Sequence, residues 1–225
     1  MASRAPGSGV RGLPRKTFRV APSAPLSRLE AILRRAARDL DDLGRRWALV
    51  GALAVSARAE PRFTRDIDLV IAVASDDDAE RLVRDLQARG YRVQAIVEQE
   101  ATLRLATARL MPADEDETGV VLDTLFASSG IESEIVAGSE TLEILPDLRT
   151  PVATTGHLIA LKILARDDRL RPQDRVDLVA LVAAATPADI EQARSAIALV
   201  TRRGFHRGKD LVTDLEQFLA AHRAK

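Results

Sequence analysis

The sequence contains no cysteine, which excludes disulfide bonds, thiolate metal sites and cysteine nucleophiles together. A chain without disulfides suits a reducing compartment, and we expect a cytoplasmic protein. Aromatic residues account for only 3% of the 225 residues, whereas the hydrophobic and charged fractions, 46% and 29%, are those of an ordinary globular protein. The formal net charge is zero, so any contact with nucleic acid or a membrane must come from a local patch.

Long apolar runs are missing as well. No apolar stretch reaches the ~20 residues that a membrane-spanning helix requires. The first 22 residues are basic and rich in Gly, Pro and Ser, and they lack the apolar region of a secretory signal. We therefore expect a flexible basic tail over residues 1–22 and no membrane partner.

The remaining sequence predicts an α/β (α+β) protein in two parts. Between residues 23 and 150, segments with helical spacing of apolar residues alternate with short apolar or alternating runs that predict strands. After Pro151 every segment has helical spacing, which predicts a C-terminal helical region over residues 151–225. The two parts meet without a flexible linker, so we expect the helices to pack on the α/β core. Strands are predicted at 47–51, 66–74, 91–99, 101–110, 120–127 and, as the last one, 141–145.

Two carboxylates stand one residue apart at the start of the predicted strand "DIDLVIAVA". Side chains in a strand alternate between faces, so Asp66 and Asp68 project from the same face, with Ile67 on the other. Two like charges this close are costly unless a proton, a cationic partner or a metal ion relieves them. Magnesium, or manganese in its place, suits the position because it takes one or two carboxylates and completes its octahedron with water and substrate phosphates.

A third acid, Asp123, lies inside the apolar run "VVLDTLF", where a solvated surface residue is not expected. If this strand neighbours the first, three carboxylates converge as they do in two-metal phosphoryl transfer. A structural interpretation is open for each acid: Asp66 could cap a turn or pair with Arg62 or Arg65, and Asp123 could pair with one of the many arginines. The glycine-led segment upstream favours the functional interpretation.

That segment begins at Gly51, which closes a predicted strand and opens a predicted helix over about residues 52–59. A glycine at this point leaves the backbone N–H groups of the helix N-terminus open to a phosphate. The short helix then delivers the chain to the acidic strand.

These residues resemble the nucleotidyltransferase superfamily with the polymerase-β-like fold, whose signature is Gly-Gly or Gly-Ser, a spacer, and Asp-x-Asp. The stretch "GALAVSARAEPRFTRDIDLV" is most similar to the branch that contains the AbiEii toxins and related minimal nucleotidyltransferases. Ala52 stands where the signature has its second Gly or Ser, which keeps the backbone donors and loses a hydroxyl. The positions that match are Gly51, Ala54, Arg62, Thr64, Asp66, Ile67, Asp68 and Leu69, and further along the chain Lys162, Asp174, Asp177 and Leu178.

The resemblance implies a nucleotidyltransferase-like mixed sheet flanked by helices, an NTP donor and Mg²⁺ or Mn²⁺. It implies that Asp66, Asp68 and Asp123 hold metal and act in catalysis, and that Lys162 adds charge for the phosphates. Nucleotide binding would involve Gly51, Ala52, Arg62, Thr64 and Lys162. For Asp174 and Asp177 two interpretations are open: one of them steadies Lys162 or an arginine, or they form a helix cap and a surface pair.

The function we expect is metal-dependent transfer of a nucleoside monophosphate from an NTP to RNA, tRNA, protein or a small molecule. That the protein is the toxin of a toxin–antitoxin pair, with an antitoxin protein as its partner, is one hypothesis within this function. A catalytically silent regulatory relative that binds a nucleotide or a partner, and an antibiotic-modifying nucleotidyltransferase, are the alternatives. RNA contact has one local source, the basic loop at 201–210 together with cations of the tail. These tail cations are Arg4, Arg11, Arg15, Lys16 and Arg19.

Overall fold

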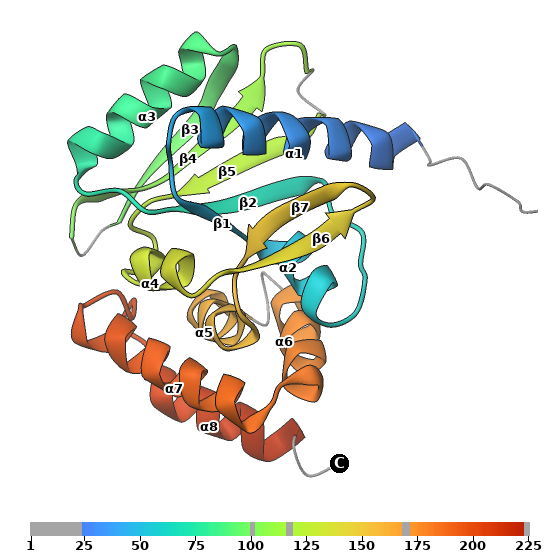
Figure 1. Cartoon of the computed structure of the whole chain (residues 1–225). Helices are drawn as coiled ribbons and strands as arrows, with labels where there is room; N and C mark the ends of the chain where they lie inside the picture. Colours follow the sequence, from blue (N-terminus) through green and yellow to red (C-terminus); the bar gives the residue numbers. More distant parts are fainter. Residues whose placement is uncertain (1–23, 100–101, 116–118, 168–171, 223–225) are drawn as a thin grey trace, which may run out of the picture.

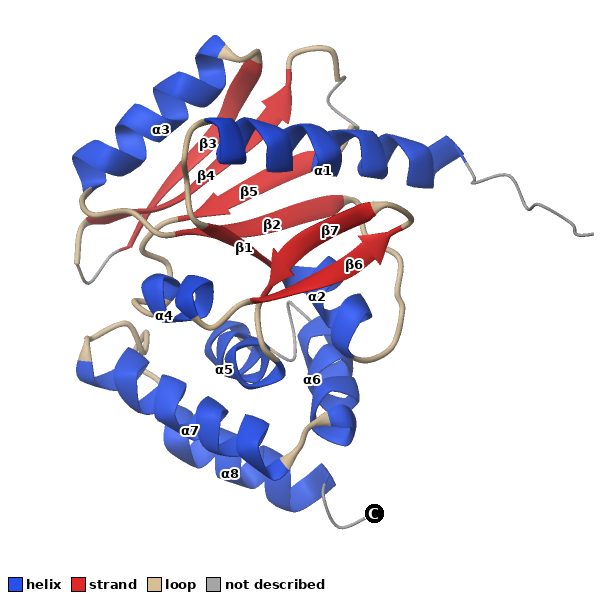
Figure 2. Ribbon diagram, viewed as in Figure 1, coloured by secondary structure: helices blue, strands red, loops and turns tan. Residues whose placement is uncertain are grey.

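The computed structural model describes residues 24–99, 102–115, 119–167 and 172–222, with side chains from residue 28 onward. Within these residues one mixed sheet is covered by helices on both faces, as Figures 1 and 2 show. The α/β class predicted from the sequence is confirmed. The basic tail predicted over residues 1–22 lies outside the described residues.

The sheet has the strand order β3-β4-β5-β2-β1-β7-β6. The central pair β2 and β5 is parallel, and β1 and β4 run antiparallel to their neighbours β2 and β5. This order places the two strands predicted to carry acids side by side in the middle of the sheet. The strands are β1 Trp47–Val50, β2 Asp66–Ile71, β3 Tyr91–Gln99, β4 Arg104–Pro112, β5 Val121–Leu125, β6 Glu140–Leu145 and β7 Leu148–Val152.

Helices cover both sides of the sheet (Figure 1). One side is covered by α1 (Ala24–Asp42) and α3 (Asp76–Ala88). On the other side, α5 (Thr155–Ala165) lies between the sheet and the outermost pair of helices. The remaining helices are α2 Gly51–Arg58, α4 Glu132–Ala137, α6 Pro172–Ala184, α7 Pro187–Arg202 and α8 Leu211–His222.

The helix ends follow the capping signals of the sequence. The Ser75 side chain accepts a hydrogen bond from the Asp78 amide at the start of α3, and three acids follow in its first turn. Thr186 and Asp189 form a reciprocal capping box at the start of α7. Gly90, with φ +87°, follows the end of α3, as expected for a residue that ends a helix in the left-handed region.

One strand was not predicted. The last strand predicted from the sequence is the one at 141–145, but β7 (Leu148–Val152) follows it and lies between β1 and β6. Pro151 hides this strand, because a proline cannot donate to a ladder and argues against a strand inside a sheet. The pairing is nevertheless maintained, since the Ala153 amide donates to the Leu49 carbonyl at 3.0 Å. The change of pattern near residue 150 therefore falls within β7, and the helices begin at Thr155.

The two parts of the chain share one hydrophobic core. Buried residues of the sheet, such as Leu69 and Leu122, belong to the same cluster as Leu158 of α5, Leu181 of α6 and Ile197 of α7. The first turns of α5 are buried on nearly every side, so this helix is an internal element and not a surface cover. Among the described residues, no helix combines the length and the apolar character needed to cross a bilayer.

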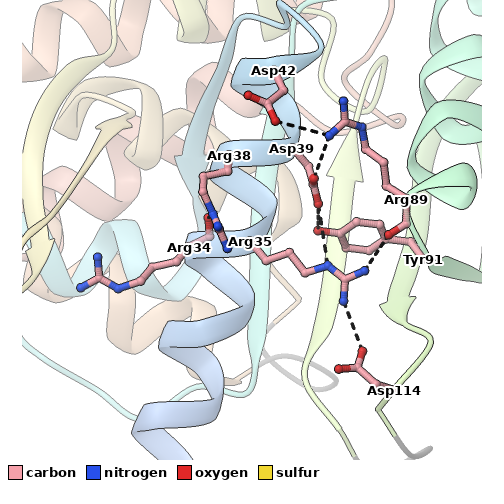
Figure 3. Close-up of polar contacts among 8 residues, drawn as sticks. All are labelled: Arg34, Arg35, Arg38, Asp39, Asp42, Arg89, Tyr91 and Asp114. Carbon is pink, nitrogen blue, oxygen red and sulfur yellow. Dashed lines mark hydrogen bonds and ion pairs between the residues drawn. The ribbon is translucent and has the colours of Figure 1, made fainter.

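A polar cluster joins α1 to the edge of the sheet, and Figure 3 shows its members. The Tyr91 hydroxyl donates to Asp39 at 2.8 Å, and the Arg35 guanidinium lies over the tyrosine ring at 4.7 Å. Arg89, just after α3, also donates to Asp39, at 3.0 Å. Burial and the hydrogen bond to Asp39 raise the pKa of Tyr91, so its hydroxyl stays a donor at neutral pH. On the other side of α1, Arg34 donates to the carbonyls of Pro146 and Asp147 in the turn before β7.

His157 links stability to pH at the start of α5. Its side chain is only 6% exposed, and its Nδ1 lies 3.0 Å from the Thr154 hydroxyl. Burial lowers the pKa of His157 below its usual 6.5, while the charge of Glu134 opposes the shift. A lowered folded-state pKa means that the unfolded chain binds the proton more readily, so stability is complete above pH 6.5 and falls as the pH drops through the folded-state pKa.

We expect the free energy of unfolding of the wild-type protein to fall with pH below 6.5 more steeply than that of His157→Gln, measured by urea unfolding between pH 5 and pH 8. Glutamine keeps the polar character of the site and does not titrate. The control is His222→Gln, which replaces the histidine that stacks on Phe218. Parallel pH curves for wild type and His157→Gln would contradict this assignment.

Candidate active site

Every residue that the sequence analysis named for catalysis, metal or nucleotide lines one cavity. The cavity has a volume of about 410 Å³ and lies between the sheet, the start of α2 and the helices α5 and α6. Walls of different chemistry meet in it: carboxylates from the strands, the backbone of the helix start, and cations from the loop before β2 and from α5. The predicted residues in the wall are Gly51, Ala52, Arg62, Thr64, Asp66, Asp68, Asp123 and Lys162.

The three acids share one face of the sheet at neighbouring positions. Asp66 and Asp68 are two residues apart on β2, and Asp123 of β5 is the direct parallel partner of Asp68. Direct partners in a ladder point their side chains to the same side, so the three carboxylates converge toward the cavity. Asp66 is exposed, Asp68 is half-buried, and the Asp123 side chain is 13% exposed. The sequence predicts that the three carboxylates converge if the two strands are neighbours, and β2 and β5 are neighbours.

Asp123 also has the arginine partner that the structural interpretation allowed. Arg109 of β4 is its direct antiparallel partner, and the guanidinium donates from Nε to Oδ1 at 2.9 Å and from Nη2 to Oδ2 at 2.7 Å. The bond to Asp123, and after it the charges of Asp66 and Asp68, raise the pKa of Arg109. Among the described residues, no group of three or more His, Asp or Glu side chains is arranged so that it could hold a metal ion.

Gly51 is required where the helix start meets the acids. It has φ +62°, a conformation that favours glycine, and a Cβ placed there would lie 1.9 Å from Oδ2 of Asp68. The backbone at the start of α2 therefore approaches the Asp68 carboxylate more closely than any side chain would permit. The N-cap residue of α2 is Val50, and its side chain makes no capping hydrogen bond. Ala52 follows with 4% exposure, so its small side chain is packed inward.

Both predicted site residues in the loop before β2, Arg62 and Thr64, make polar contacts that fix the loop. The Thr64 hydroxyl and the Asp66 backbone exchange hydrogen bonds, with the Asp66 amide 3.2 Å from Thr64 Oγ1. Arg62 reaches away from the strand to α6, where its Nε lies 2.7 Å from Asp177 Oδ1 and its Nη2 donates to Oδ2 at 3.0 Å. Thr64 thus shapes the turn into the acidic strand, and Arg62 fastens the loop to the helical part.

Lys162 belongs to the same buried ion network. Its ammonium lies 2.7 Å from Oδ1 of Asp174 and 2.7 Å from Oδ2 of Asp177. Burial opposes ionisation of Asp177, but the hydrogen bonds from Lys162 and Arg62 outweigh it and hold the pKa of this carboxyl below its usual value. Of the two interpretations of the aspartates, the surface pair is wrong, because Asp174 and Asp177 are 6% and 1% exposed and both hold Lys162.

Arg109 is the site residue that sequence reasoning missed. Its strand was predicted, and an arginine at an alternating position is an ordinary surface residue in such a strand. Only the register of β4 against β5 places it opposite Asp123, and register is not visible in the residues themselves.

The basic loop at 201–210 is engaged within the fold. Lys209 donates to the carbonyls of Leu164 and Arg166 at the end of α5, at 2.9 and 2.7 Å. Arg203 pairs with Glu134 of α4. The tail cations, the other half of the expected RNA patch, lie outside the described residues. In the described part of the chain these contacts give the loop a structural role.

The acids on the central strands and the glycine-led helix start thus lie together on one mixed sheet, in one cavity. The family described as "Nucleotidyl transferase AbiEii toxin, Type IV TA system" matches residues 31–224 of the chain. The protein belongs to this AbiEii nucleotidyltransferase family, which confirms the resemblance found in the sequence. None of the curated proteins matches the chain in sequence.

Solved structures resemble the chain distantly. An antigenic nucleotidyltransferase-like protein from Paracoccidioides brasiliensis is 19% identical with a TM-score of 0.48, and the match covers 84% of this chain and 93% of that one. The antibiotic-resistance factor ANT(2'')-Ia is 18% identical with a TM-score of 0.47, over 89% of this chain and 93% of that one. The lincosamide antibiotic adenylyltransferase LnuA is 16% identical with a TM-score of 0.41, over 71% and 97%. The family assignment rests on the match over residues 31–224.

Proposed function

We propose that the protein transfers a nucleoside monophosphate from an NTP to an acceptor, with Mg²⁺ or Mn²⁺ held by the acids of the sheet. The observation that carries the proposal is the position of Asp66, Asp68 and Asp123 on one face of neighbouring strands, beside the start of α2 and in one cavity. The acceptor classes are RNA or tRNA, a protein, and a small molecule, and the Type IV toxin description of the family supports a cognate antitoxin.

The residues fit a hard divalent cation. The donors are carboxylate oxygens, which Mg²⁺ and Mn²⁺ prefer, and Asp66 is exposed to the cavity. Gly51 leaves room beside Asp68 where a Cβ would collide with the carboxylate. Asp66 and Asp68 would hold the metal, and Asp123 would complete the set when Arg109 leaves it. When bound, divalent cations would neutralise the triphosphate and stabilise the charge on the departing pyrophosphate.

The chain's own groups bind and orient the substrates. Gly51 and Ala52 line the cavity at the N-terminus of α2, where a phosphate is favoured by free N–H groups and by the helix dipole. Lys162 would add positive charge at a position fixed by Asp174 and Asp177, and Arg62 and Thr64 would hold the loop that carries Asp66. Asp123 would accept the proton of the acceptor hydroxyl. The oxygen of that hydroxyl would bond to the α-phosphorus as pyrophosphate departs.

Thermal melting with ligands tests the proposal. A ligand that binds the folded protein at 100 times its Kd should raise Tm by roughly 5 to 10 °C for a chain of this size. We expect this shift with Mg²⁺ and at least one of the four NTPs together, and we expect Asp66→Asn to lose it. Asp85→Asn on α3, outside the cavity, is the control. Melts unchanged by every NTP and metal combination would rule the proposal out.

Labelled NTPs then separate transfer from binding alone. The wild-type protein should move label from the α-phosphate position to RNA, protein or a small molecule in a mixed extract and release pyrophosphate. Metal-dependent NTP binding without label transfer to any acceptor would favour the silent regulatory relative, for which Ala52 is the sequence argument. Transfer that Asp66→Asn leaves intact would remove the acids from the mechanism.

A further inference from the structure

Arg109 faces the acidic cluster without being part of any signature found in the sequence. Across the sheet, Arg109 of β4, Asp123 of β5 and Asp68 of β2 stand in one row of direct partners. The two hydrogen bonds to Asp123 form the fork geometry in which an arginine binds a carboxylate most specifically. The row therefore places a cation against the outermost of the three acids.

The two partners differ in their freedom to move. The Asp123 side chain is 13% exposed, whereas the Arg109 side chain is 49% exposed and lines the cavity. Asp123 is therefore held in place by its surroundings, and the guanidinium has solvent and cavity space into which it can swing. A guanidinium also binds a phosphate through the same fork that it offers to a carboxylate.

We propose that Arg109 is the resident counter-cation of this cluster, which occupies Asp123 until the triphosphate of the nucleotide draws the guanidinium away and opens the carboxylate to a divalent metal. The inference rests on the proposed function. It assigns Arg109 as a nucleotide-contacting residue that also couples metal binding to nucleotide binding. One Arg–Asp pair is exchanged for an Arg–phosphate pair and an Asp–metal contact, so each ligand should strengthen binding of the other, and by the same factor.

Metal binding without nucleotide is the first test, with Mn²⁺ as the probe and free Mn²⁺ measured by electron paramagnetic resonance. Removal of the competing cation in Arg109→Met should tighten Mn²⁺ binding by about 5- to 150-fold, the usual range of such coupling. The matched control is Arg104→Met, which removes an arginine of the same strand that pairs with Asp76 outside the cavity. It should bind Mn²⁺ like the wild type.

Nucleotide binding without metal is the second test, measured with each NTP in EDTA by calorimetry. Arg109→Met should bind more weakly than the wild type, and Asp123→Asn should bind more tightly because it releases the guanidinium. Arg109→Lys retains the charge without the fork and should give a Mn²⁺ affinity between those of wild type and Arg109→Met. The lysine variant provides a second measurement if Arg109→Met melts at a lower temperature than the wild type.

The outcomes distinguish this inference from the proposed function. Tighter Mn²⁺ binding and weaker metal-free NTP binding in Arg109→Met, with Arg104→Met unchanged, would establish the role of Arg109. Mn²⁺ binding that is lost in Asp66→Asn but unchanged or weaker in Arg109→Met would overturn the inference and leave the proposed function standing. If neither the wild type nor any variant binds Mn²⁺, with or without NTP, both fail.

Discussion

Replacing Gly51 with alanine is expected to reduce nucleotide transfer by about 100-fold or more, the cost of a displacement of about 1 Å in a catalytic group. The added Cβ would lie 1.9 Å from Oδ2 and 2.5 Å from Cγ of Asp68, so one of the two residues must move. The Asp68 carboxylate is the group that moves more easily, because it lies at the end of a side chain. It is also the group proposed to hold the metal. The rate of NTP-dependent labelling of any acceptor that the wild-type protein modifies is the measurement.

The chain contains a matched control for this substitution. Gly44 has φ +64°, almost the same as Gly51, and a Cβ there meets nothing within 4 Å in the described part of the chain. Both alanine variants should therefore carry the backbone strain of an L-residue in the left-handed region, about 1–2 kcal/mol. Only Gly51→Ala should also lose Mn²⁺ affinity and transfer. Equal transfer rates in the two variants would show that the contact with Asp68 is unimportant.

The largest effect on stability is expected at Asp177. Asp177→Ala removes a carboxylate that is 1% exposed, so Arg62 loses its ion-pair partner and Lys162 keeps Asp174 alone, which leaves one positive charge in excess. Breaking a buried pair in this way costs about 3–5 kcal/mol, because an uncompensated charge remains in the interior. Urea unfolding at pH 7 measures the loss. The contacts of Arg62 and Lys162 also imply that the loop before β2 becomes less ordered, so nucleotide binding should weaken in the same variant.

A double substitution separates charge from packing. Lys162→Met combined with Asp177→Leu removes one charge of each sign, so the charges that remain in the network, Arg62 and Asp174, still balance. Apolar groups fill the space, an exchange that is often neutral or stabilising for a buried pair. The double variant should therefore be more stable than Asp177→Ala. A double variant as unstable as the single one would show that the ion network is not what holds α6 in place.

The same carboxylate sets part of the acid limit of the fold. Since the folded-state pKa of Asp177 is below the ordinary 3.8, its contribution is fully present above pH 3.8 and is lost as the pH falls through the folded value. His157 acts at a higher pH, because its contribution is lost below 6.5. We therefore expect the loss of stability below pH 6.5 to be smaller in His157→Gln. The loss below pH 3.8 should be smaller in Asp177→Ala but should remain, because Asp78, Glu134 and Asp210 also have lowered pKa values.

The sequence by itself determined the ends of the helices and the face of the strand on which the first two acids lie. Helix ends followed from Ser75, Gly90 and the box at Thr186, because a cap is made by residues within four positions of one another. The shared face of Asp66 and Asp68 followed from strand alternation alone. These predictions depended on neighbours along the chain, and for that reason a single sequence was enough.

Only the tertiary structure decided which strands lie side by side. The register of β2, β5 and β4 set Asp68, Asp123 and Arg109 in one row, and the packing of α5 on α6 gave Lys162 its two aspartates. The strand containing Pro151 formed because β1 and β6 flank it, against the local preference of its residues. Contacts between distant segments depend on how whole elements pack, and the competing cation of the site, Arg109, was visible only at that level.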